Sequence, residues 1–265
     1  MDKGFVVLAQ NTQDVDYVKC AEALAHSIKK TMPDAKITLV SDNGSTCNVF
    51  DSVVPLPHGD QDPTGDWKLS NDWQVYEASP YEYTIKLEAD MYLPKSIDHW
   101  WPVLQKREVV VSTTIRNFKQ EISKVRAYRR FVYDNKLPDT YNAITYFKKS
   151  PAASDFFGVI KDVFENWKTY TPMLQCNPDE MVTTDWAYSL ASHILGKEHT
   201  TMPQFKDMSM IHMKQFVNNT PSEDWTEVLV YELLEHALRI NTIPQMYPFH
   251  YHVKKFADVI LEQSK

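Results

Sequence analysis

The chain has 265 residues, 43% of them hydrophobic and 24% charged, a composition typical of a globular protein with one large α/β domain. Its 6 glycines argue against a glycine-rich nucleotide loop, and its net charge of -7 excludes an overall attraction to nucleic acid or anionic membrane. Three widely spaced cysteines fit free thiols in a reducing compartment. Residues 1–4 show no signal-peptide pattern and no stretch reaches the roughly 18–20 apolar residues of a membrane span, so we expect a cytoplasmic protein without a membrane partner.

The first 40 residues follow the pattern of a β-α-β unit. Residues 5–9 form a short continuous apolar run, which predicts a central buried strand. An amphipathic helix opens at Asp14 or Asp16 and ends at residues 32–33, and residues 37–40 predict a second strand. Such a unit predicts parallel strands joined by a right-handed crossover.

Polar residues follow both of these strands. Gln10, Asn11 and Thr12 stand in the first loop, where they are positioned to contact a nucleotide. Asp42 ends the second strand, a place where sheets of this kind often hydrogen-bond a ribose. Asp42 also fits an ordinary turn aspartate, and position alone does not separate the two interpretations.

Strands and helices continue to alternate along the chain. We predict strands at 49–57, 83–90, 108–114, 141–147, 208–212 and 248–254, and helices at 67–78, 96–105, 119–133, 150–167, 177–195 and 222–234. This alternation predicts an α/β fold with a mostly parallel sheet flanked by helices.

The strand from residue 83 ends in two carboxylates, Glu88 and Asp90, before Pro94 stops it. Residues two apart on an extended backbone point to the same side. At the carboxyl end of a strand, two such oxygen donors suit Mg²⁺ or Mn²⁺ carrying a diphosphate. The alternative is an acidic strand end that is merely solvated.

Four groups of residues together resemble the motifs of GT-A-type glycosyltransferases, above all the glycogenin-like branch. The first group is Lys68-Leu69, Trp73 and Tyr76 followed by Ile85 to Met91, and the other three are Asn142-Ala143-Ile144, Asp179-Glu180 and Ile211 to Lys214. The resemblance implies a Rossmann-type catalytic domain at 1–215, with 216–265 as a C-terminal extension packed on it. It also implies a UDP-sugar donor, a bound Mn²⁺ or Mg²⁺, and sugar transfer to an acceptor hydroxyl.

The resemblance assigns the metal to Glu88, Asp90 and His212. His250 and His252 are rival ligands, with His252 the preferred alternative to His212. From their spacing of two we expect them on opposite faces of a strand, so that only one faces the cleft. Glu88 stands where the family has aspartate.

Other roles also follow from the resemblance. Lys68 and Lys214 would counter the diphosphate charge, and Asn142 would lie in the donor site. Asp185 or Asp179 would supply the carboxylate that binds the transferred sugar or the acceptor, with Asp185 preferred because Trp186 is beside it.

A basic segment at 116–136 carries seven cations and two acids, a local charge of +5 in an acidic protein. On a helix, Arg126, Arg129 and Arg130 would share one face, which suits contact with nucleic-acid phosphates, or equally a solvated basic helix. From the loop at residues 9–12 to the run at residues 250–254, the chain also resembles proteins of large tailed phages that make modified cytosine. That similarity implies hydroxymethylcytosine in phage DNA as the acceptor, and a glucose- or arabinose-like sugar.

Three other functions remain open at this point. In the first, the protein is a glycosyltransferase whose acceptor is a glycan or a protein. In the second, the protein is a sugar-1-phosphate nucleotidyltransferase, although residues 9–12 lack the glycine-rich loop of that class. In the third, it is a non-catalytic nucleic-acid-binding protein with the same fold.

Overall fold

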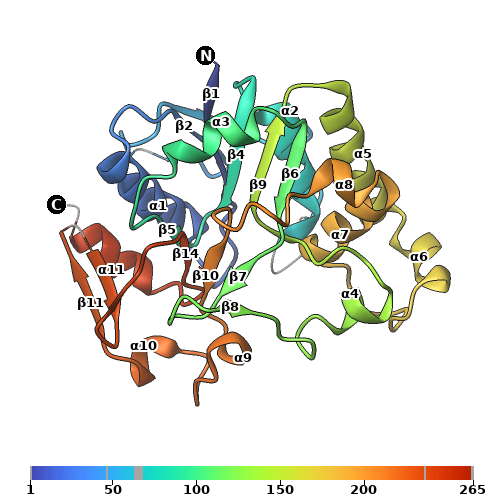
Figure 1. Ribbon diagram of the computed structural model, residues 1–265. Helices are drawn as coiled ribbons and strands as arrows, with labels where there is room; N and C mark the ends of the chain where they lie inside the picture. Colours follow the sequence, from blue (N-terminus) through green and yellow to red (C-terminus); the bar gives the residue numbers. More distant parts are fainter. Residues whose placement is uncertain (1, 46, 63–67, 236, 264–265) are drawn as a thin grey trace.

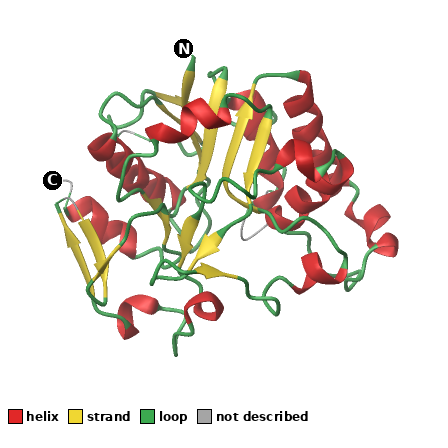
Figure 2. Ribbon diagram, viewed as in Figure 1, coloured by secondary structure: helices red, strands yellow, loops and turns green. Residues whose placement is uncertain are grey.

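The computed structural model describes all residues except 1, 46, 63–67, 236 and 264–265, and a six-stranded sheet runs through its centre (Figures 1 and 2). In sheet order the strands are β3 (Ser52–Val54), β2 (Ile37–Val40), β1 (Lys3–Leu8), β4 (Tyr83–Glu88), β9 (Tyr141–Lys148) and β6 (Val109–Ser112). The first four are parallel, and β9 is antiparallel to both of its neighbours. The predicted mostly parallel sheet is confirmed.

Helices cover both faces of this sheet, and its central strands β1 and β4 are buried on both sides. On β1, Phe5 and Val7 pack with α1 (Tyr17–Thr31), whereas Val6 packs into the core under α5 (Pro151–Glu165) and α7 (Thr184–Ile194). Figure 1 shows α1 on one side of the sheet and α5 with α7 on the other. The predicted β-α-β opening is therefore present.

A second sheet extends from the carboxyl edge of the first. Its order is β5 (Met91–Tyr92), β14 (Phe249–His250), β10 (Met210–His212), β7 (Ile115–Arg116) and β8 (Ile122–Ser123). β14 comes from the predicted C-terminal extension and pairs with β10 and β5. The last helix, α11 (Phe256–Glu262), lies against α1, where Lys19 and Asp258 form an ion pair at 2.9 Å.

The remaining elements are short. A small antiparallel sheet contains β11 (Tyr231–Leu234), β12 (Ala237–Ile240) and β13 (Ile243–Pro244). The short helices are η1 (Leu69–Gln74), α2 (Val75–Ala78), η2 (Asp98–Trp100), α3 (Trp101–Leu104), α4 (Arg130–Asp134), α6 (Trp167–Tyr170), η3 (Thr171–Met173), α8 (Lys197–Thr200), α9 (Gln215–Asn218) and α10 (Trp225–Val228). Within the described residues, every helix is too short or too polar to cross a membrane.

The predicted helix at 119–133 was wrong. Residues 115–123 form the β7–β8 hairpin instead, and only 130–134 are helical. Gln120 has a left-handed backbone (φ 66°), and Asn117 accepts a hydrogen bond from the Glu121 amide at 3.1 Å, so a tight turn forms where the helix was expected.

Three other helix predictions differ in extent. Helix α7 begins at Thr184 because Thr183 caps it, so Asp179 lies before the helix and is exposed. In the predicted helix at 222–234, only α10 is helical, since 231–234 pair with 237–240. The helix at 67–78 is η1 followed by α2, and its expected start at Trp67 lies outside the described residues.

Asp51 gives the fold a measurable dependence on pH. Although burial alone would raise its pKa, hydrogen bonds from Lys36, Lys29 and the Ile37 amide hold the Asp51 pKa at about 2, against an ordinary 3.8. A depressed pKa contributes stability above the unfolded-state pKa, and the contribution is lost as pH falls through the folded-state pKa.

We therefore expect Asp51→Asn to lower the free energy of unfolding by about 1 kcal/mol at pH 7, because solvent screens these surface contacts, and by roughly half of that at pH 3. Urea unfolding at both pH values measures the difference. An equal loss at pH 7 and pH 3 would contradict an ionic origin.

Candidate functional site

A cavity of about 600 Å³ opens at the carboxyl ends of β1 and β4. Antiparallel β9 begins at the same edge and brings Asn142 there, while β10 and β14 close the opposite wall. The predicted site residues that line the cavity are Gln10, Lys68, Glu88, Asp90, Arg129, Asn142, Asp185, His212, Lys214 and His252. This is the edge of an α/β sheet where ligands bind.

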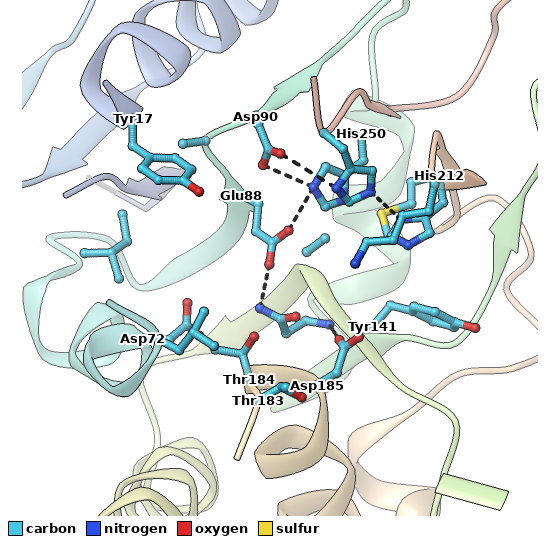
Figure 3. Close-up of a pocket in the computed structure, with 18 of the residues that line it drawn as sticks. Tyr17, Asp72, Glu88, Asp90, Tyr141, Thr183, Thr184, Asp185, His212 and His250 are labelled. Atoms are coloured by element: carbon cyan, nitrogen blue, oxygen red, sulfur yellow. Dashed lines mark hydrogen bonds and ion pairs between the residues drawn. The ribbon is translucent and has the colours of Figure 1, made fainter. Parts of the chain in front are cut away.

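Glu88, Asp90 and His250 converge at the centre of the cavity (Figure 3). His250 Nε2 lies 3.2 Å from Glu88 Oε2 and 3.1 Å from Asp90 Oδ1. Lys254 forms an ion pair with the other oxygen of Asp90. His250 reaches this position because β14 pairs with β5, the strand that directly follows Asp90.

His212 and His252 lie immediately behind His250. His252 Nε2 is 3.2 Å from His212 Nδ1, and the His250 and His252 rings are 3.8 Å apart. The expectation that only one of His250 and His252 faces the cleft was wrong. Residues two apart keep to one side of an extended backbone, and both rings line the cavity.

The structure also differs from the predicted ligand set, because His250 rather than His212 lies beside both carboxylates. Two candidate groups of ligand atoms are present among the described residues: Glu88, Asp90 and His250, and the three histidines. Both groups contain His250.

These residues fit a divalent transition metal. The buried His212 Nε2 and His250 Nδ1 have no hydrogen-bond partner, so the cluster has nitrogen atoms that are free to bind a metal ion. Imidazole with carboxylate suits Mn²⁺ better than Mg²⁺, which prefers oxygen alone.

The electrostatics of the two carboxylates differ. Burial raises the pKa of Glu88. Asp90 is also buried, but His250 and Lys254 hold its pKa well below the usual value. Burial and the neighbouring His250 lower the pKa of His212 and of His252 well below 6.5, which keeps both rings in the neutral form that binds metal.

A hydrogen-bonded chain connects Glu88 to the opposite wall. The side-chain Nδ2 of Asn142 donates to Glu88 Oε1 at 2.8 Å. The backbone N–H of the same residue donates to Asp185 Oδ1 at 3.0 Å. Arg129 Nη1 donates to Asp185 Oδ2 at 2.6 Å and Arg129 Nε donates to Asp139 at 2.8 Å. Both oxygens of Asp185 are thus held at the first turn of α7.

The predicted basic face is therefore absent in the expected form. The Arg129 side chain is 4% exposed and anchors the cavity wall, whereas that of Arg130 is 84% exposed and pairs with Asp134. Arg126 is also exposed. The three arginines share no helix face because only the last of them lies in α4.

Two predicted cations and Gln10 line the cavity with contacts of their own. Lys68 pairs with Asp60 at 2.8 Å, and Lys214 Nζ lies 4.9 Å from the centre of the Tyr128 ring. Gln10 accepts a hydrogen bond from Asn71 at 2.8 Å.

The described lining does not include Asn11, Thr12, Asp42, Asp179, Arg126 or Arg130. Several of these residues organise turns. Asn11 accepts a hydrogen bond from the Val18 amide at 2.9 Å, and Thr12 from the Val15 amide at 3.1 Å. Asp42 accepts from the Leu56 amide at 3.1 Å, a contact that joins the segments following β2 and β3.

Lining residues to which the sequence assigned no role include Tyr17, Asp72, Tyr128 and Lys254. The sequence pattern could have indicated Lys254, since it follows His250 and His252 in one alternating run. Asp72 stood in a predicted helix beside Trp73 and resembled an ordinary helix acid.

If the cation lies between the carboxylates and His250, His250→Ala lowers the affinity for Mn²⁺ about tenfold or more, and His212→Ala lowers it less. The loss of the free-ion electron paramagnetic resonance signal on titration measures this affinity. His99→Ala, which removes an exposed histidine, is the control. A larger loss for His212→Ala would contradict the assignment to His250.

No protein-family model matches the chain, and no curated protein matches it by sequence. Solved structures do match. The galactosyltransferase LgtC, in complex with donor and acceptor sugar analogs, aligns with a TM-score of 0.57 at 11% identity, over 100% of this chain and 95% of that one. The glycosyltransferase GlyE of Streptococcus pneumoniae TIGR4 aligns with a TM-score of 0.55 at 9% identity, over 100% of this chain and 60% of GlyE. At such identity the likeness establishes the fold, and the chain has the GT-A fold of these glycosyltransferases.

Proposed function

We propose that this protein is a metal-dependent glycosyltransferase that moves a sugar from a UDP-sugar to an acceptor hydroxyl. The convergence of Glu88, Asp90 and His250 at the carboxyl edge of a GT-A sheet carries the proposal. The cavity of about 600 Å³ is large enough for a nucleotide sugar. LgtC, which shares the fold over this whole chain, has been solved with donor and acceptor sugar analogs.

Glu88, Asp90 and His250 would hold Mn²⁺ or Mg²⁺, with His212 and His252 as further imidazoles beside them. A divalent cation neutralises charge that develops on a diphosphate leaving group. Lys214, Lys254 and Lys68 line the same cavity and supply protein cations for that charge.

Asp185 is the carboxylate best placed to contact the transferred sugar or the acceptor. Arg129 and the Asn142 amide fix its orientation, and each of its oxygens keeps a second acceptor position for a ligand hydroxyl. In the transfer, the bond between the anomeric carbon and the diphosphate oxygen breaks. A bond to the acceptor oxygen forms, and the proton of the acceptor hydroxyl passes to the departing UDP. Asp179 lies outside the cavity lining, so we assign it no role in this step.

The acceptor proposed from sequence resemblance is hydroxymethylcytosine in phage DNA, with a glucose- or arabinose-like sugar. Arg126 and Arg130 are exposed and can contact phosphate groups. Arg129 is buried and cannot. A glycan or protein acceptor is the alternative.

Metal-dependent hydrolysis or transfer from a panel of UDP-hexoses and UDP-pentoses tests the proposal. We expect turnover with Mn²⁺, none with chelator, and a loss of about 100-fold or more in Asp90→Ala, because the cation loses a carboxylate ligand. Asp179→Ala removes an exposed carboxylate outside the cavity lining and is the matched control.

Each reaction is run with and without hydroxymethylcytosine DNA. Turnover that requires this DNA supports the DNA acceptor, and turnover indifferent to it directs the search to glycans and proteins. If none of the UDP-sugars binds or reacts, the enzyme proposal fails.

A further inference from the structure

A second buried charge network lies under the floor of the cavity. Lys86, on β4 two residues before Glu88, has a side chain that is only 1% exposed. Its ammonium lies 2.6 Å from Asp72 Oδ1 and 3.4 Å from the Asn142 carbonyl. An ammonium buried this deeply requires a charged partner, and Asp72 is that partner.

Asp72 lies in η1 and is held by Lys86 of β4, and a residue of α7 holds it as well. Tyr188, a fully buried residue of α7, donates its hydroxyl to Asp72 Oδ2. One contact to each oxygen, from β4 and from α7, fixes the carboxylate within η1. Burial and this neighbouring carboxylate raise the pKa of Tyr188 well above 10, so the phenol keeps the proton that it donates.

The Asp72 carboxylate nevertheless reaches the cavity. It lines the same cavity as Glu88 and Asp185, and Figure 3 shows Asp72 and Asp185 on the side of Glu88 away from His250. A carboxylate has about four acceptor positions, and the contacts from Lys86 and Tyr188 use two of them. An oriented anionic acceptor therefore faces the space next to the metal ligands.

Pairing with Lys86 uses one oxygen of Asp72 and does not account for the position of Asp72 in the cavity lining. Replacing a buried ion pair with apolar residues of similar volume is often neutral or stabilising, so such a pair is weak evidence of a purely structural role. A fixed carboxylate with unused acceptor positions instead matches the way that polar groups in ligand cavities orient a bound hydroxyl.

We propose that the Asp72 carboxylate, positioned by Lys86 and Tyr188, accepts a hydrogen bond from a hydroxyl of the transferred sugar and determines which sugars the site takes. The inference rests on the proposed function, because it requires a nucleotide sugar whose diphosphate lies on the His250 side of Glu88. The ligand class is a sugar with a free hydroxyl directed at Asp72. A site that hydrogen-bonds a hydroxyl rejects analogues that lack it, since its buried acceptor is then unpaired.

Equilibrium binding, measured by calorimetry with Mn²⁺ present, tests the inference without requiring turnover. The probes are UDP alone, the tightest-binding UDP-sugar from a panel of hexoses and pentoses, and its monodeoxy analogues. We expect Asp72→Asn to weaken UDP-sugar binding about 10- to 100-fold relative to UDP binding. One deoxy analogue should bind the wild type more weakly than the parent sugar does, and this difference should vanish in Asp72→Asn.

Two further variants keep the test decisive. Tyr188→Phe retains the Lys86–Asp72 pair, so it guards against a folding defect in Asp72→Asn, and we expect the same sugar-specific loss at a smaller size. Asp258→Asn breaks an exposed ion pair between α1 and α11 and is the matched control.

The outcomes separate the two proposals. If UDP and UDP-sugar affinities fall equally in Tyr188→Phe and in Asp72→Asn, or do not change, the role of Asp72 is refuted and the glycosyltransferase proposal stands. If the wild type binds neither UDP nor any UDP-sugar, both proposals fail.

Discussion

The site depends on one constraint: the charged side chains that β4 buries need ion-pair or hydrogen-bond partners. Its apolar residues Ile85 and Leu87 pack into the core, while Lys86 and Glu88 point to the other side. Charged groups removed from water are costly unless paired and hydrogen-bonded. The neighbouring elements therefore meet at the end of β4 because each supplies a partner for one of these charges.

Each partner comes from a different part of the chain. Residues of η1 and α7 satisfy Lys86 through Asp72 and Tyr188, and β9 reaches Glu88 through Asn142. Asp90 receives His250 across a separation of 160 residues. The C-terminal segment is thus part of the site, because without it buried Asp90 would lose its contacts with His250 and Lys254.

The basic segment shows how tertiary context changes the meaning of a sequence pattern. Its arginines have helical spacing, but the Asn117–Glu121 turn and the β7–β8 pairing prevent the helix. Arg129 then enters the protein and holds Asp185 and Asp139. A residue expected to contact an external anion instead orients a carboxylate of the cavity.

The sequence by itself determined the β-α-β opening, the mostly parallel sheet, and the placement of Glu88 and Asp90 at a strand end. Those features follow from local periodicity, capping and the two-residue repeat of a strand. Only the tertiary structure decided that His250 lies beside both carboxylates, that Asp72 lines the cavity and that Arg129 is buried. Each of these depends on the pairing of segments distant in sequence, such as β14 with β5, and local pattern does not encode which distant strand will be the neighbour.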